Sequence, residues 1–373
     1  MGPEPEAVDV PVERVEARAY AVPTEAPEAG GVPDRAGGEL VVVLVRADDA
    51  VGTGWSHAPA AARAVVEDLL AGEVVERGVL DIPALHQRMR HRLRDAGGVG
   101  LGARALSAVD VALWDLKAQL LGLPLVGLLG AARPEVPVYA SGGPPGWSDD
   151  RLRELVRGWT VERGVPRVKI RIGEADGTRE RRDLERVEVA RVAAGRDGEL
   201  LVDARGAYRR GQAVRMGRRL ADAGVTWFEE PVDPDDLAGL RAVREATTPD
   251  TAAGGHGWDL PHLARLCAGE AVDCLPVDAT RCGGPTVWLR AAAVAQAHGL
   301  AVSGHAAPNL HAHLAAAVPN LEHVEWSDGH DRVERTLLLG TLDPSGGAVR
   351  PGADGAPGHG MELRPDADRY QVG

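Results

Sequence analysis

From residue 136 onward, short apolar runs alternate with amphipathic stretches. Eight runs have the length and composition of strands: 136–141, 167–172, 199–203, 225–229, 250–254, 272–277, 299–304 and 321–325. Helical periodicity fills the intervals, as at 178–195, 211–223, 234–246 and 285–298. Repeated strand–helix alternation is typical of a parallel sheet, and eight repeats predict closure into a barrel. A doubly wound open sheet is the alternative, but it usually carries a glycine-rich phosphate loop, and SGGPPGW after the first strand lacks GxGxxG spacing.

The first 130 residues follow a different pattern. Two strands are expected at 11–20 and 40–46, on either side of a Pro-, Gly- and Glu-rich loop, 21–39. Helices are expected at 60–71, 83–94 and 103–121. Strands followed by helices favour a separate α+β domain, and the loop-rich tail is expected to return to it. We therefore place the domains at 1–130 (α+β), 131–345 (barrel) and 346–373 (returning segment).

Composition excludes several classes of function. The formal net charge is −13, and no dense Lys/Arg run with interleaved aromatic residues is present, so nucleic acid is not an expected partner. No stretch approaches 18 consecutive apolar residues, so no membrane span is expected. The opening MGPEPEAVDV lacks the basic and apolar regions of a secretory signal. Because Cys267, Cys274 and Cys282 form no CxxC pair, we read them as buried free thiols and expect a cytoplasmic protein.

Ionisable residues gather at the carboxyl ends of the expected strands, where the active site of a barrel lies. They are Lys169, Arg171, Asp203, Glu229, Glu230, Asp278, His305 and Glu325. A single charged residue at a strand end is ordinary. Charged groups on most strands at the same rim indicate a site.

The residue types suggest roles within this set. Asp203 and Glu229 offer the oxygen ligands that Mg²⁺ prefers, although each is equally consistent with a structural ion pair. Asp278 and His305 follow adjacent strands, so the carboxylate can orient the imidazole and leave its other nitrogen for proton transfer. Lys169 suits contact with a carboxylate or enolate, with a salt bridge inside the barrel as the alternative.

Several segments together resemble the mandelate racemase / muconate lactonizing enzyme branch of the enolase superfamily. They are VDARGAY (202–208), WFEEPV (227–232), VDATRCGGPTVWLRAAAVAQAHGL (277–300), SGHAAPNLHAHLAAAVPN (303–320) and VEW (324–326). SAVDVALWDLKAQLLGLPLVGLLG (107–130) is similar to the end of the capping domain in that family. The resemblance covers nearly the whole chain. It implies an α/β protein with a modified TIM barrel, (β/α)7β, and an α+β capping domain.

The resemblance also implies a first chemical step, in which Mg²⁺ stabilises the enediolate formed when a base removes the proton next to a carboxylate. By the resemblance, Asp203 and Glu229 match the first two metal ligands. Asp278 and His305 match the proton-transfer dyad of the family. Lys169 matches the first lysine of the Lys-x-Lys pair on the second strand, so His305, Asp278 and Lys169 are the expected catalytic residues.

Glu325 matches the carboxylate on the eighth strand that hydrogen-bonds the substrate carboxylate. Three other positions depart from the family pattern. Arg171 replaces the second lysine; an arginine is a poor base but can hold an anion. Arg205 stands where the family often has asparagine, and both arginines are expected to bind substrate. Gly255, in AAGG, stands where AAGE usually supplies the third ligand, so Mg²⁺ is expected to be held weakly.

These residues favour a dehydratase that acts through an enediolate, and the resemblance implies acid sugars as its substrates, since their β-hydroxyl supplies the leaving group. Dehydration needs one acid–base residue, whereas racemisation needs a base on each face of the carbon, and Arg171 weakens one face. A racemase or epimerase of an α-hydroxy acid is the alternative, and a non-catalytic carboxylate-binding protein is a third. The expected partner is a small carboxylate, and the protein is expected to form a homo-oligomer. Substrate choice is expected to lie in the loop 21–39 and near Gly52–His57.

Overall fold

Eight parallel strands close into a barrel in the computed structural model, which describes residues 10–23 and 38–373. The strands are β4 (Val136–Gly142), β5 (Arg167–Arg171), β6 (Glu199–Asp203), β7 (Val225–Glu229), β8 (Asp250–Ala252), β9 (Cys274–Val277), β10 (Ala301–Gly304) and β11 (Leu321–Ser327). They are hydrogen-bonded in sequence order, and β11 pairs with β4 to close the sheet. The predicted barrel is therefore confirmed, and the open sheet is excluded.

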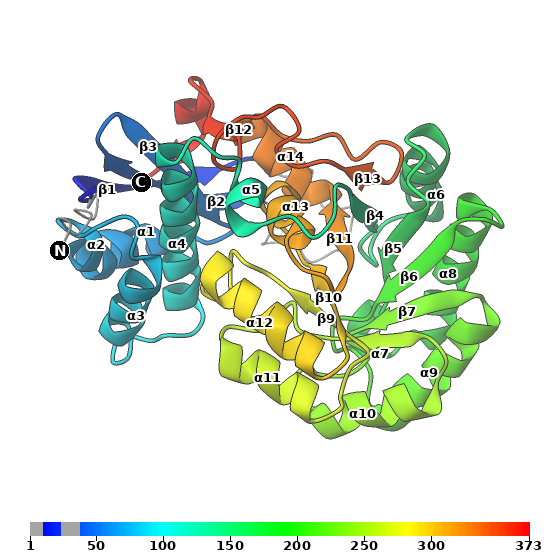
Figure 1. Cartoon of the computed structure of the whole chain (residues 1–373). Helices are drawn as coiled ribbons and strands as arrows, with labels where there is room; N and C mark the ends of the chain where they lie inside the picture. Colours follow the sequence, from blue (N-terminus) through cyan, green and yellow to red (C-terminus); the bar gives the residue numbers. More distant parts are fainter. Residues whose placement is uncertain (1–9, 24–37) are drawn as a thin grey trace.

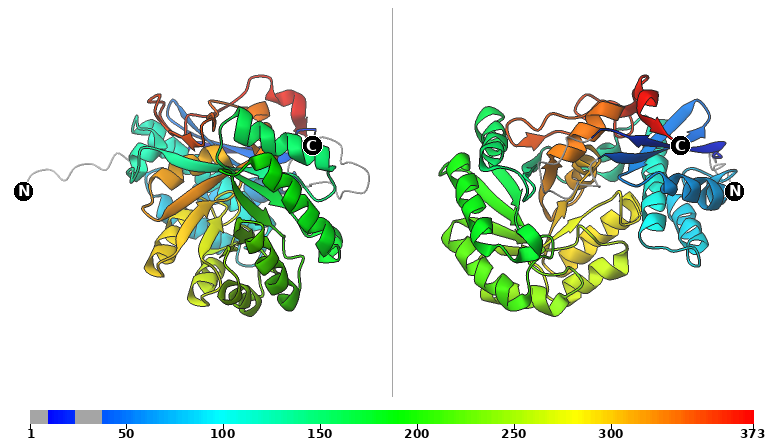
Figure 2. Two further views of the ribbon diagram at one scale, coloured as in Figure 1. Left: turned by 90° about the vertical axis from the view of Figure 1, so that its right-hand side faces the viewer. Right: turned by 180° about the vertical axis from the view of Figure 1, so that it is seen from behind.

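Helices connect these strands and lie outside them (Figures 1 and 2). They are α6 (Asp149–Arg157), α7 (Glu174–Gly177), α8 (Glu180–Ala194), α9 (Arg210–Asp222), α10 (Leu237–Ala246), α11 (Leu260–Ala268), α12 (Pro285–Ala297) and α13 (Pro308–Ala316). A π-helical turn at Gly158–Glu162 extends α6, and α14 (Asp328–Leu337) follows the last strand. Seven helical connections between eight strands give the (β/α)7β order that the resemblance implies.

The N-terminal domain combines an antiparallel sheet with helices packed against it. Its strands are β1 (Arg14–Ala21), β2 (Glu39–Ala47) and β3 (Ala50–Ser56), and its helical segments are α1 (Ala61–Val65), a π-helical turn (Val66–Leu70), α2 (Ala71–Val74), α3 (Ile82–Arg92), α4 (Leu101–Leu120) and α5 (Leu125–Leu129). The sequence analysis missed β3, because AVGTGWS contains two glycines, which are rare in strands. Those glycines let α4 approach closely: a Cβ on Gly54 would lie 2.1 Å from the carbonyl oxygen of Ala108.

The C-terminal segment runs back along the barrel to the first domain. β13 (Ala348–Val349) pairs with β4, β12 (Leu338–Leu339) pairs with β14 (Glu362–Leu363), and β15 (Gln371–Val372) pairs with β1. Figure 1 shows the C-terminus beside β1. Most of the loop 21–39, to which the sequence analysis assigned substrate choice, lies outside the described residues. Among the described helices, none is long and apolar enough to cross a membrane.

Buried polar contacts join the cap to the barrel. The Asp110 carboxylate on α4 accepts hydrogen bonds from the backbone N–H (2.9 Å) and hydroxyl (2.8 Å) of Thr286 on α12. Ser56, at the end of β3, donates to the carbonyl oxygen of Thr280 at 2.6 Å, just after β9. The cap therefore meets the barrel at the rim where the strand-end residues lie.

Candidate active site

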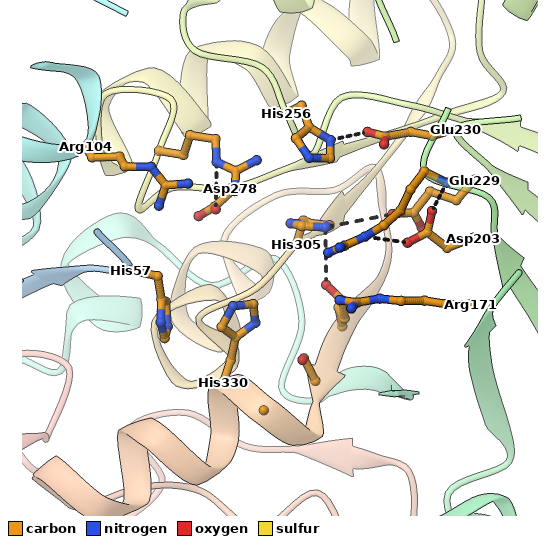
Figure 3. Close-up of a pocket in the computed structure, with 15 residues that line it drawn as sticks. His57, Arg104, Arg171, Asp203, Glu229, Glu230, His256, Asp278, His305 and His330 are labelled. Atoms are coloured by element: carbon orange, nitrogen blue, oxygen red, sulfur yellow. Dashed lines mark hydrogen bonds and ion pairs between the residues drawn. The ribbon is translucent and has the colours of Figure 1, made fainter. Parts of the chain in front are cut away.

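Strand register aligns the expected residues. Arg171, Asp203 and Glu229 are neighbours across β5, β6 and β7, one beside the next at the carboxyl ends of the strands. Seven of the eight residues singled out as catalytic, substrate-binding or metal-binding line one pocket there (Figure 3): Arg171, Asp203, Arg205, Glu229, Asp278, His305 and Glu325. Lys169, the eighth, lies two residues before Arg171 on the same face of β5.

Lys169 is buried between two carboxylates. Its Nζ lies 2.7 Å from Oε2 of Glu229 and 3.0 Å from Oε1 of Glu325, and it donates to the Tyr139 hydroxyl at 3.2 Å. Burial alone would lower the pKa of Lys169, but Glu229 and Glu325 outweigh it and hold that pKa well above its usual range. Lys169 is therefore a fixed positive charge beneath the pocket floor.

The imidazole of His305 faces the same two carboxylates. Its Nε2 lies 3.6 Å from Oε2 of Glu325 and 3.8 Å from Oε1 of Glu229. Burial lowers the pKa of His305 to about 3, so the ring is neutral at pH 7. A neutral imidazole can accept a proton, and the nearby carboxylates are placed to stabilise the imidazolium that results.

Asp278 and His305 share the pocket, but the expected hydrogen bond between them is not formed. The Asp278 carboxylate instead accepts from the backbone N–H (2.8 Å) and hydroxyl (2.7 Å) of Thr280 and lies 3.6 Å from Nε of Arg281. Nδ1 of His305 has no hydrogen-bond partner within the described residues. Burial opposes ionisation of Asp278, yet Arg281 and then His305 hold its pKa below the usual range. Asp278 therefore acts on His305 through its charge.

Arg205 is held in a strained conformation beside Asp203. Its φ is 49°, in the left-handed region that side chains other than glycine rarely adopt. Its backbone N–H donates to Oδ1 of Asp203 at 2.8 Å, and its Nε lies 3.8 Å from Oδ2. Strain of this kind persists only where surrounding contacts maintain it, as at ligand sites.

The side chains do not fit a magnesium site with three protein ligands. Glu229 is bound by Lys169 and also accepts from Nε1 of Trp227 at 3.0 Å. Gly255 offers no oxygen, and the His305 ring fills the adjacent space: a Cβ on Gly255 would lie 2.9 Å from Nε2 of His305. Within the described ranges, no group of three or more His, Cys, Asp or Glu side chains could hold a metal.

Further residues around the pocket were not assigned roles from the sequence. Oε1 of Glu230 lies 2.7 Å from Nδ1 of His256, within hydrogen-bond distance. Arg104, from the first turn of α4, and Arg281 line the pocket together with His57 and His330. The sequence analysis placed Glu230 among the residues at the strand ends and indicated the segment that ends at His57, without giving either a role. Arg104, His256, Arg281 and His330 lie inside helices or loops, where nothing in the sequence separates a pocket residue from a surface residue.

Comparison with known proteins fits this architecture. Residues 14–130 match the mandelate racemase / muconate lactonizing enzyme N-terminal domain, and residues 151–367 match the enolase C-terminal domain-like family. The chain belongs to the mandelate racemase / muconate lactonizing enzyme subgroup of the enolase superfamily.

Individual relatives of this mandelate racemase-type chain include dehydratases and cycloisomerases of sugar acids. It is 31% identical over 301 residues to L-talarate/galactarate dehydratase of Salmonella typhimurium, an alignment that covers 77% of this chain and 73% of that protein.

Solved structures of similar proteins share the fold. A mandelate racemase/muconate lactonizing enzyme-like protein from Rubrobacter xylanophilus is 42% identical, with a TM-score of 0.89 over 97% of this chain and 100% of that one. An enolase from Bradyrhizobium, complexed with magnesium and mandelic acid, is 29% identical, with a TM-score of 0.88 over 98% and 99% of the two chains. Structural relatives of this mandelate racemase-type chain therefore bind magnesium.

Proposed function

We propose that the protein dehydrates an acid sugar by removing the proton next to its carboxylate, with His305 as the acid–base residue. The observation that carries this proposal is the placement of a neutral imidazole beside Glu325, Glu229 and the buried ammonium group of Lys169. Relatives that dehydrate talarate, galactarate, rhamnonate and arabinonate support the reaction class.

The proposed reaction balances with one acid–base group. His305 takes the α-proton, and the electron pair left on the carbon delocalises into the carboxylate to give an enediolate. The enediolate then expels the β-hydroxyl group, which receives the proton from His305 and leaves as water. The enol that remains tautomerises to a 2-keto-3-deoxy acid. The substrate is oxidised at one carbon and reduced at its neighbour, so no external redox partner is needed.

Positive charge near the enediolate lowers the barrier to forming it. Lys169 supplies a fixed charge beneath the site, and Arg171 and Arg205 stand at the pocket rim. We assign the substrate carboxylate to this end of the pocket. An arginine in place of the second lysine favours binding of this anion over proton abstraction on the opposite face.

Two assays on an acid-sugar library test the proposal. The dehydratase forms a 2-keto-3-deoxy acid, whereas a racemase or epimerase returns substrate that has acquired solvent deuterium at the α-carbon. Accumulation of α-deuterated, inverted substrate without water loss would replace dehydration by racemisation.

For magnesium, we propose weak binding by Asp203 and Glu229. Asp203 and Glu229 supply two carboxylates, and Glu229 is already paired with Lys169. Few protein oxygens are therefore free to bind Mg²⁺, and water and substrate oxygens have to complete its coordination. Titration calorimetry should give little heat with the free protein and a tighter association when an acid sugar is present. Tight binding to the free protein would mean that side chains rearrange to complete the site.

A non-catalytic carboxylate-binding protein is the second candidate. The missing hydrogen bond between Asp278 and Nδ1 of His305 favours it, because an unoriented imidazole is a weaker acid–base catalyst. Binding of acid sugars without α-proton exchange for any member of the library would establish this function instead.

A further inference from the structure

Arg104 reaches the pocket from the cap and forms no ion pair with a carboxylate of the described residues. Its guanidinium group lies 5.5 Å from the centre of the Trp258 ring. Arg281 lies over the same ring, at 5.3 Å. Arg281 also donates to the carbonyl oxygen of Gly255 at 2.7 Å and lies 3.6 Å from Asp278. Two guanidinium groups therefore flank one indole, and of the two only Arg281 pairs with Asp278.

The two guanidinium groups carry more positive charge than the carboxylate of Asp278 can neutralise. Removing a cation from water is costly unless an anion accompanies it. Burial, and then the charge of Arg281, lower the pKa of Arg104 to about 10, while Asp278 offsets only part of this effect. Asp278 is already bound by two hydrogen bonds from Thr280. An anionic group bound between Arg104 and Arg281 would compensate both cations.

The two arginines lie at the opposite end of the pocket from Arg171. Figure 3 shows Arg104 on one side and Arg171 on the other, with His305 between them; His57 and His330 lie below, His57 on the side of Arg104. The pocket therefore has guanidinium groups at both ends. A ligand with an anionic group at each end could contact guanidinium groups at both.

Two buried imidazoles, His57 and His330, also line the pocket, and Nε2 of His57 lies 3.8 Å from Oε1 of Glu334. Both ring nitrogens of His57 and Nδ1 of His330 are buried and have no hydrogen-bond partner within the described residues. The two rings pack with their centres 4.2 Å apart. Burial lowers the pKa of His57 to about 4 and that of His330 to about 3, so both rings are neutral at pH 7. A neutral imidazole can donate with one nitrogen and accept with the other, which suits a hydroxyl group.

We propose that Arg104 and Arg281 form a second anion subsite, which selects acid sugars with an anionic group at each end of the carbon chain. The far group is a carboxylate or a phosphate, and His57 and His330 bind hydroxyl groups between the ends. The proposal rests on the proposed function for the placement of the first carboxylate beside Arg171. It does not depend on turnover.

Calorimetric binding of matched sugar acids tests the subsite. The panel consists of the hexaric acids, the hexonic acids of the same stereochemistry, and the corresponding 6-phosphohexonates, each titrated into the full chain. At least one dianionic member should bind about tenfold or more tightly than its hexonate partner, a difference of about 1.4 kcal/mol. A preference for hexarates identifies the far group as carboxylate, and a preference for 6-phosphohexonates identifies it as phosphate. If no dianionic member binds more tightly than its partner, the proposal is wrong.

The variant Arg104→Met keeps much of the side-chain length and removes the charge. It should erase the preference for the dianionic ligand and change hexonate binding by less than about twofold, since the C6 hydroxyl group of a hexonate brings no charge to the subsite. Arg92→Met, on the exposed end of α3, is the matched control and should leave both affinities unchanged. Equal weakening of both ligands, or an unchanged preference, contradicts the proposal. An Arg104-dependent preference without turnover of any acid sugar would remove the dehydratase function and retain the subsite.

Discussion

The imidazole of His305 lies where a side chain at position 255 would begin, so the two positions are coupled. The backbone of Gly255 is outside the left-handed region, and another residue is therefore compatible with its conformation. Contact with the ring is the obstacle: an added Cβ would lie 2.8 Å from Cδ2 and 3.1 Å from Cγ of His305. A glutamate at this position would displace His305 as well as add a carboxylate.

Gly255→Ala isolates this steric effect from any change in charge. The methyl group should push the ring away from Glu325 and Glu229, lower α-proton exchange by about tenfold or more, and destabilise the fold by about 1–3 kcal/mol through overpacking. Exchange followed by NMR in D₂O and urea unfolding provide the two measurements. Gly158→Ala, where the added Cβ meets nothing within 4 Å, is the control. Unchanged exchange in Gly255→Ala would show that the ring position does not matter for proton transfer.

His305→Asn tests the acid–base assignment directly. Loss of the imidazole should reduce α-proton exchange by about 10²-fold or more, while substrate binding and unfolding remain close to those of the parent protein. Asp278→Asn should reduce exchange less severely, because Asp278 acts on His305 through charge and makes no hydrogen bond with it. Exchange at the parental rate in His305→Asn would assign the base to another residue.

At the scale of elements, the barrel strands were predictable because their apolar runs and helical intervals repeat regularly. The same pattern predicted that Glu325 and the other charged residues at strand ends lie close together, since the carboxyl ends of the strands meet at one rim of the barrel. The strand expected at 250–254 is shorter, Asp250–Ala252, because the chain leaves the sheet before Gly254. β3 was missed because its glycines make room for close packing of α4, and α4 lies about 50 residues later in the sequence.

The surroundings of Arg104 and the orientation of the His305 ring were not predictable for a related reason. Arg104 belongs to a helix that looks ordinary in sequence, and its pocket environment arises from Trp258 and Arg281 on distant loops. The orientation of His305 depends on the absence of a side chain at Gly255. Sequence pattern places a residue on an element, whereas these orientations depend on contacts between elements.

Gly54→Ala tests the packing of α4 on β3. Its Cβ would lie 2.1 Å from the carbonyl oxygen of Ala108 and 2.4 Å from the backbone nitrogen of Ala112, and neither backbone atom can move without shifting the helix. We expect a loss of about 1–3 kcal/mol in the free energy of unfolding, measured by urea denaturation. Gly72→Ala, in the open on α2, should instead be neutral or slightly stabilising. Equal stability of the two variants would mean that α4 does not pack this closely.

At the scale of the whole molecule, the contacts that dock the cap also support the site. Ser56 on the cap donates to the carbonyl oxygen of Thr280, and Thr280 donates two hydrogen bonds to Asp278. Trp55, next to Ser56, donates to Glu334 on α14 at 3.0 Å. Detachment of the cap would therefore loosen Asp278 and remove Arg104 from the pocket together.

The buried Asp110 makes this docking dependent on pH. Burial raises the pKa of Asp110 from 3.8 to about 7, and the hydrogen bonds from Thr286 only partly oppose the shift. The folded protein therefore binds this proton more tightly than the unfolded chain does. The resulting contribution to stability is present below pH 4 and is lost as the pH rises through 7.

Asp110→Asn should remove this dependence, since the amide keeps the shape of the carboxyl group and cannot ionise. As the pH rises from 4 to above 7, the unfolding free energy of the variant should increase relative to that of the parent protein by up to about 4 kcal/mol. This figure follows from ~1.36 kcal/mol for each unit of pKa shift. Urea unfolding of both proteins across this range measures it. The comparison cancels the opposite trend from buried histidines such as His57 and His86, whose lowered pKa values favour stability at higher pH equally in both proteins. A difference that stays constant with pH would show that Asp110 is ionised throughout, with a counter-charge at the interface between cap and barrel.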